Sequence, residues 1–148
     1  MDAPVPRIRV AALAVEGDRI LLVLHRSGKK EYYLLPGGGI EKGETDGEAL
    51  KRELLEETGL AATPVRLLFQ TESVSPDKSR HIIQKVYLTD VSGGITKSRD
   101  KRVVKAVMMK RADFATVKFY PNIREHILSA WDKSFPGPAM LLRVPWED

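Results

Sequence analysis

Apolar residues occur in short runs separated by turn residues along most of the chain, a pattern typical of β-strands. Six such segments are predicted to be strands: 7–15, 19–25, 32–35, 64–73, 81–90 and 103–109. The turn signal Glu16-Gly17-Asp18 separates the first two segments, which therefore predict a β-hairpin.

Two other segments have the spacing of a helix. The first covers 46–58, because Thr45 and Glu48 match a capping box and Gly59 can close the far end in the left-handed conformation. The second covers 121–132, because proline is favoured at the first helical position and apolar residues then recur along one face.

The order of these elements favours an α/β (α+β) fold with a mixed β-sheet sandwiched between helices over a regular βαβ array. The length of 148 residues fits one domain covering 1–148. The tail 134–148 contains proline-broken pieces that the pattern assigns to no element.

Composition narrows the class of protein. Hydrophobic residues make up 43% and charged residues 30%, which is ordinary for a globular protein. The lack of cysteine excludes disulfides, thiolate metal sites and a cysteine nucleophile, and it suits a cytoplasmic location.

No membrane association is expected, because no apolar run approaches the roughly 20 residues of a membrane helix. The N-terminus does not resemble a secretory signal. The net charge of +4 is compatible with an anionic partner.

Three glutamates gather on one side of the first predicted helix. Glu53, Glu56 and Glu57 are spaced i, i+3 and i+4, beside an apolar stripe of Leu50 and Leu54. Like charges at this spacing repel one another, so a plain solvated helix is the less favoured interpretation. A divalent cation reverses the sign of this cost, and hard cations such as Mg²⁺ prefer carboxylate and carbonyl oxygens.

Glycines precede this helix directly. The run Gly37-Gly38-Gly39 lacks side chains, so its backbone can approach a ligand closely. Arg52 can pair with Glu48 or Glu56 along the helix, or it can reach back to Glu44 and join the loop to the helix.

The segment as a whole resembles the signature of the Nudix hydrolases, which runs over 23 residues here. That signature is Gly, five residues, Glu, seven residues, and then Arg-Glu-apolar-any-Glu-Glu-any-Gly-apolar. All nine of its positions are matched: Gly38, Glu44, Arg52, Glu53, Leu54, Glu56, Glu57, Gly59 and Leu60.

The resemblance implies a divalent-metal-dependent hydrolase that cleaves the diphosphate linkage of a nucleoside diphosphate joined to another group, X. It also implies that Mg²⁺ or Mn²⁺ is held by Glu53, Glu56 and Glu57, with a carbonyl of Gly37 or Gly38. A cation there would neutralise developing charge and activate a water molecule.

The resemblance further implies roles for the remaining residues of the signature. Arg52 belongs to the catalytic set and, with Glu44, supports the loop and the helix, while Gly59 ends the helix. Glu53 is the first choice as general base, and Asp77 is a weaker candidate.

Further substrate contacts are expected outside the helix. The candidates are Arg7, Arg9, Arg26, Gly39, Asp77 and His81. Arginine can bind a phosphate through two hydrogen bonds, but each candidate is also compatible with an ordinary surface or edge position. The basic run at 97–102 is interpreted either as a solvated turn or as a phosphate contact. Asp100 is the only acid in 97–105, so a fourth carboxylate ligand is not expected there.

The choice of substrate depends on a weaker signal. Pro76 lies 16 residues beyond Leu60, a distance similar to that in relatives that act on ADP-ribose, which favours ADP-ribose or another nucleotide sugar. The alternatives are nucleoside triphosphates, dinucleoside polyphosphates and capped RNA. A nucleotide-sensing module without activity and a nucleic-acid-binding protein are alternatives of another class. A homodimer is compatible with the resemblance.

Overall fold

The computed structural model describes residues 5–147. The elements of this range are β1 (Arg7–Leu13), β2 (Val15–Glu16), β3 (Arg19–Ser27), β4 (Lys30–Leu34), β5 (Gly37–Gly39), α1 (Asp46–Thr58), β6 (Ala61–Val74), β7 (His81–Ser92), β8 (Val103–Lys110), α2 (Arg111–Phe114), α3 (Arg124–Asp132) and β9 (Met140–Arg143). The domain predicted over 1–148 also includes residues 1–4 and 148, which lie outside the described range. Within that range, no helix combines the length and the apolar character needed to cross a membrane.

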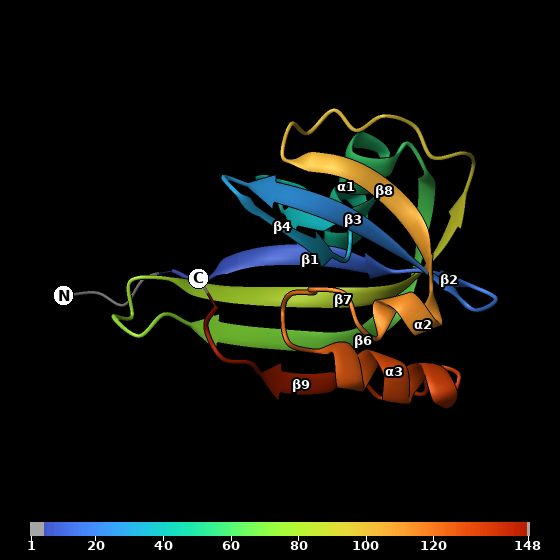
Figure 1. Ribbon diagram of the computed structural model, residues 1–148. Coiled ribbons are helices and arrows are strands. Elements are labelled where there is room, and N and C mark those ends of the chain that lie inside the picture. Colours follow the sequence, from blue (N-terminus) through green and yellow to red (C-terminus); the bar gives the residue numbers. More distant parts are fainter. Residues whose placement is uncertain (1–4, 148) are drawn as a thin grey trace.

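Two sheets form the body of the protein, as Figure 1 shows. The larger sheet has the strand order β5-β1-β7-β6-β9. It is mixed, because β1 runs parallel to β7 and β6 runs parallel to β9, whereas β5 and β1 are antiparallel and so are β6 and β7. In the smaller sheet, β3 pairs with β2, β4 and β8. The predicted mixed α+β class is therefore confirmed, but the single sheet that was expected is divided in two.

The helices cover opposite sides of β1. Val10 and Ala12 of β1 pack in one apolar cluster with residues of α1, whereas Ala11 and Leu13 pack in a second cluster that includes Ile127 of α3. Successive side chains of a strand point to opposite faces, so a strand that is buried on both faces is apolar without alternation. This explains the continuous apolar run in the first strand.

The predicted hairpin of the first two strands is wrong for most of its length. Only the short strand β2 pairs with the start of β3, through Val15 opposite Ile20, whereas β1 pairs with β5 and β7. A strand that is apolar on both faces needs a paired strand at each edge and packed elements on each face. Local turn signals do not show which strands and helices fill these positions.

The first helix forms where it was predicted. The Thr45 side chain accepts a hydrogen bond from the Glu48 N–H, and the Glu48 side chain accepts one from the Thr45 N–H, which confirms the capping box. Gly59 ends the helix with φ of 78°, and a Cβ at that position would overlap the Thr96 hydroxyl. Glycine is therefore required there both for its conformation and for space.

The C-terminal half differs from the prediction in two places. The helix predicted from Pro121 begins instead at Arg124, after Ile123 in a non-helical conformation. Part of the unassigned tail, Met140–Arg143, forms β9, which adds to the edge of the larger sheet beside β6 with Leu142 opposite Thr71. The chain end is therefore placed next to the sheet face that carries the candidate site described below.

Candidate active site

A hydrogen bond joins the glycine strand to the glutamate helix. The Gly37 N–H donates to the Glu57 carboxylate at 2.8 Å, and β5 is paired with β1 through Gly38 opposite Val10. A Cβ on Gly37 would overlap the Val10 carbonyl oxygen, so the close pairing requires glycine. The glycine run is thus held between the sheet and α1.

Arg52 is the centre of an ion-pair network that connects the loop to the helix. Its Nε and Nη2 donate to the two Glu44 carboxylate oxygens at 2.7 and 2.9 Å, and its Nη2 also donates to the Gly39 carbonyl at 3.1 Å. The hydrogen bonds that Arg52 donates to Glu44 lower the pKa of Glu44 to about 2, and the same bonds raise the pKa of Arg52. The structure shows the Arg52–Glu44 contact that the sequence suggested, and this contact supports the loop.

Glu53 points its carboxylate at the glycine strand. A Cβ on Gly38 would lie 2.5 Å from the Glu53 carboxyl carbon, and the Arg52 Nη1 donates to Glu53 at 2.8 Å. Burial raises the pKa of Glu53; the Arg52 hydrogen bond opposes this shift, and the negative charges of Glu57 and Glu56 add to it. Glu53 is therefore a partly desolvated carboxylate among like charges, which is a setting that a cation would stabilise.

The other two glutamates differ in exposure. Glu57 is 2% exposed, whereas the Glu56 side chain is 42% exposed and its carboxylate lies 3.6 Å from the Arg52 Nη1. Across residues 5–147, no set of three or more acidic or histidine side chains is already arranged to hold a metal ion. The oxygen donors nevertheless fit a hard cation. The carboxylates lie next to the glycine strand, whose backbone is accessible because it carries no side chains.

His25 on β3 lies against the buried glutamate. Its Nε2 is 3.6 Å from a Glu57 carboxylate oxygen and has no hydrogen-bond partner among the described residues. Glu57 is far from His25 along the chain, and only the packing of β3 beside α1 brings the two together. No local motif could have identified this pair.

Two adjoining hollows lie beside these residues. The first, called here the carboxylate cleft, has a volume of about 650 Å³ and is lined by Gly37, Gly38, Gly39, Glu53 and neighbouring residues. The second, called the aromatic cavity, has a volume of about 440 Å³ and is lined by Tyr32, Tyr120, Trp146 and residues of the larger sheet. Arg7, Arg9 and Arg102 line both hollows.

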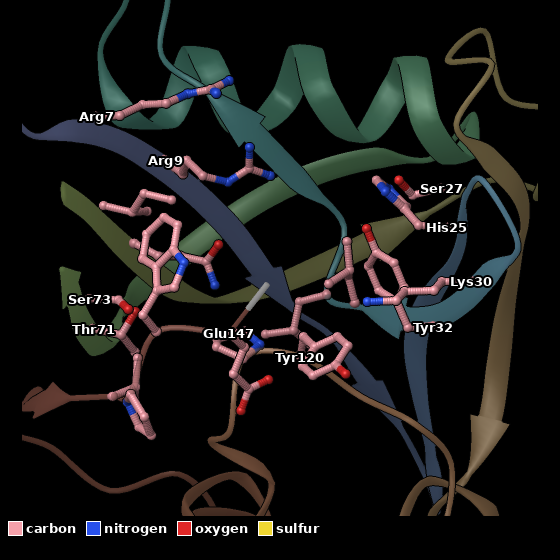
Figure 2. A pocket seen from close by; sticks show the side chains of 18 of the residues that line it. Arg7, Arg9, His25, Ser27, Lys30, Tyr32, Thr71, Ser73, Tyr120 and Glu147 are labelled. Atoms are coloured by element: carbon pink, nitrogen blue, oxygen red, sulfur yellow. The ribbon is translucent and has the colours of Figure 1, made fainter. Parts of the chain in front are cut away.

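Arg9 is the most enclosed of the three shared arginines. Burial lowers its pKa most and the nearby charge of Arg7 adds to this effect, whereas Glu57 and Glu53 raise it. In Figure 2, Arg9 projects from β1 near Arg7, and Thr71 and Tyr32 line other parts of the same cavity. An arginine remains charged under these conditions and offers planar donors that suit phosphate oxygens.

Arg102 comes from the basic run, for which the sequence left two interpretations open. Its guanidinium is paired with the Asp100 carboxylate, with Nη2 to Oδ2 at 2.9 Å, and this hydrogen bond raises the pKa of Arg102 and lowers that of Asp100. Lys97, Arg99 and Lys101 are exposed and line neither hollow. Arg102 alone of this run therefore reaches the site, and Asp100 is engaged with it.

Three predicted substrate contacts lie elsewhere. Arg26 is paired with Glu31 at 3.2 Å. Asp77 accepts hydrogen bonds from serines of its own loop, with Ser79 providing the largest contribution, which lowers the pKa of Asp77 to about 2. His81 contacts Glu72 at 2.7 Å. Arg26, Asp77 and His81 do not line either hollow, whereas Arg7, Arg9 and Gly39 line the carboxylate cleft.

The comparisons with known proteins identify the class to which this chain belongs. A sequence profile described as the NUDIX domain matches residues 5–130, which is most of the chain. The chain therefore belongs to the Nudix hydrolase family.

Two curated relatives carry more specific names. An ADP-ribose pyrophosphatase of Methanocaldococcus jannaschii is 38% identical over 119 residues, which cover 80% of this chain and 66% of that protein. The phosphatase NudJ of Escherichia coli K12 is 34% identical over 74 residues, which cover 50% of this chain and 48% of NudJ. The match thus spans less than two thirds of the length of either relative.

Solved structures agree with the fold. A NUDIX hydrolase from Nitrosomonas europaea superposes with a TM-score of 0.78 at 21% identity, covering 90% of this chain and 93% of that one. An ADP-ribose pyrophosphatase from Streptococcus suis superposes with a TM-score of 0.71 at 18% identity, covering 94% and 99%. At these identities the similarity establishes the architecture alone.

Proposed function

We propose that this protein is a metal-dependent pyrophosphohydrolase that cleaves the diphosphate linkage of a nucleoside diphosphate joined to another group, with ADP-ribose or another nucleotide sugar as substrate. The observation that supports this most is the position of three arginines, Arg7, Arg9 and Arg102, on the wall shared by the carboxylate cleft and the aromatic cavity. A diphosphate bound there would have one end at the glutamates and the other at the aromatic side chains. The name of the archaeal relative favours ADP-ribose within this class.

The metal would be Mg²⁺ or Mn²⁺. Glu53, Glu56 and Glu57 would hold it with a carbonyl of Gly37 or Gly38, and when bound it would neutralise phosphate charge and lower the pKa of a water molecule.

The chain's own residues supply the rest of the chemistry. The arginines of the shared wall bind the diphosphate oxygens and hold the phosphorus near the cleft. Glu53 accepts the proton of the attacking water, because its carboxylate lies on the wall of the carboxylate cleft, beside the glycine backbone. Arg52 and Glu44 keep Glu53 and the glycine loop in position. Asp77, bonded within its own loop, is not assigned the role of base.

A substrate panel tests the proposal. ADP-ribose, nucleotide sugars, nucleoside triphosphates, diadenosine polyphosphates and capped RNA would be incubated at about pH 8 with Mg²⁺ or Mn²⁺, and the products identified by mass. The expected result is metal-dependent cleavage of ADP-ribose or a nucleotide sugar well above the other groups. Preference for triphosphates would contradict the substrate assignment, and binding without cleavage would support a sensor instead.

Matched variants separate the chemistry from the fold. Glu53→Gln should keep the thermal stability and lose most of the activity, whereas Glu125→Gln, on an exposed residue of α3, should change neither. Full activity in Glu53→Gln would refute the role of Glu53. A cytoplasmic location and a homodimer stay predictions from the sequence.

A further inference from the structure

A row of side chains crosses the larger sheet from the glycine strand toward the chain end. Arg9 lies opposite Gly39 on one side and opposite Gln84 on the other, and Gln84 lies opposite Thr71. Residues in register on neighbouring strands point to the same face, and strands lie about 4.8 Å apart, so the row extends over roughly 14 Å. Arg9, Gln84 and Thr71 all line the aromatic cavity.

The chain end closes the far side of this row. The Val144 N–H donates to the Glu72 carbonyl at 3.0 Å, which continues the pairing of β9 with β6 and directs the segment 145–147 along the cavity wall. The Arg80 guanidinium lies 5.2 Å from the centre of the Trp146 ring and holds the indole from the loop between β6 and β7. Trp146 is therefore positioned by the strand pairing that precedes it and by its contact with Arg80.

Two tyrosines form another part of the cavity wall. The rings of Tyr32 and Tyr120 meet edge to face, with their centres 5.3 Å apart, and Figure 2 shows both on the side of the cavity away from Thr71 and Ser73. Along the row, the cavity therefore presents the cation of Arg9, then the polar groups of Gln84 and Thr71, and then the segment with Trp146, whereas the two tyrosines form a separate aromatic wall. A nucleoside phosphate presents the matching groups in the same order: an anion, a polar sugar and a flat base with polar edges.

We propose that the chain end, residues 144–147, completes the substrate site, and that Trp146 is the surface on which the nucleobase stacks while Gln84 and Thr71 contact polar groups of the nucleoside. The aromatic cavity then takes the nucleoside rather than group X. The assignment of the phosphate end to Arg9 rests on the proposed function, but binding of a nucleoside monophosphate requires no cleavage.

A fluorescence titration tests this directly. The chain has two tryptophans, so Trp131→Phe leaves Trp146 as the single reporter. AMP, GMP, CMP, UMP and ribose 5-phosphate would be added without metal. We expect a saturable change in Trp146 emission with at least one nucleotide and none with ribose 5-phosphate. An equal response to ribose 5-phosphate, or no response to any nucleotide, would overturn the proposal.

Variants of the chain end give a second, independent measurement. In calorimetry, Trp146→Ala should bind the responding nucleotide about tenfold more weakly or worse, which is the effect expected for loss of one base–aromatic stack, and Trp146→Phe should recover most of the affinity. Leu141→Ala is the matched control, because Leu141 is 77% exposed on β9 and does not line the cavity. Wild-type affinity in Trp146→Ala would count against stacking.

The two proposals fail in different ways. If the protein cleaves nothing on the substrate panel but Trp146 responds to nucleotides, the proposed function fails and the assignment of the base site holds. If cleavage is normal and Trp146→Ala changes neither KM nor kcat, the base site is wrong and the hydrolase stands.

Discussion

Gly38→Ala separates the catalytic requirement for glycine from the structural one. A Cβ at this position would lie 2.5 Å from the Glu53 carboxyl carbon, whereas ordinary contact begins at 3.4 Å. The carboxylate must therefore move by roughly 0.9 Å. Such a displacement of a reacting group costs on the order of 100-fold in rate, or about 2.7 kcal/mol of transition-state stabilisation.

The folded state should tolerate this change. The nearest atoms to the added Cβ belong to the end of a flexible side chain, so Glu53 can rotate away without moving the backbone. We expect a thermal midpoint close to that of the wild type and a kcat about 100-fold lower, measured by unfolding scans and initial rates on the same samples.

Gly37→Ala is the contrasting variant. Its Cβ would overlap the Val10 carbonyl oxygen and approach the Ala11 Cα, both of which are backbone atoms that cannot rotate away. We expect destabilisation of about 3 kcal/mol or more, because the pairing of β5 with β1 must open. Gly38→Ala with full activity would refute the placement of Glu53 at the reacting centre, and equal destabilisation of the two variants would refute the distinction between them.

Three further predictions concern the substrate arginines, the loop and the helix. Arg9→Ala should raise KM about tenfold or more by removing charge-assisted hydrogen bonds to phosphate, whereas Arg26→Ala, at a residue that lines neither hollow, should leave KM within about twofold; equal effects would contradict the assignment. Glu44 has a pKa of about 2, below its usual 4.5, so its contribution to stability is present above pH 4.5 and is lost as the pH falls toward 2. Glu44→Gln should remove this part of the pH dependence in denaturant unfolding, and a curve parallel to that of the wild type would show that the ion pair adds no stability. Thr45→Ala should cost about 1 kcal/mol in urea unfolding through loss of the N-cap, and Thr45→Ser should restore it.

The helix and its carboxylate face were determined locally. The signals from Thr45 to Gly59 lie within one segment, so hydrogen-bond capping and helical spacing specify the element without knowledge of its neighbours. The Arg52–Glu44 contact could also be predicted from the sequence, because the two residues lie close together in one loop–helix segment. The solvent exposures of Glu53, Glu56 and Glu57 could not be predicted in this way, because they depend on which elements pack against the helix.

Strand pairing, in contrast, could not be predicted from local sequence. Apolar runs predicted most of the strands, but the turn at 16–18 suggested a hairpin that only Val15 and Glu16 form with β3. A buried strand can accept any neighbour that matches its length and apolar faces, so the pairing of β1 with β5 and β7 is a property of the whole sheet.

By itself, the sequence determined the family, the glutamate helix and the carboxylates proposed to hold the metal, because these follow from spacing within 23 residues. Only the tertiary structure decided which other groups reach the site. Arg102, His25 and Trp146 come from separate elements, and nothing in their local sequence distinguishes them from solvent-exposed or core residues. Long-range packing brings them together, because the sheet register and the added strand β9 set their distances from the helix.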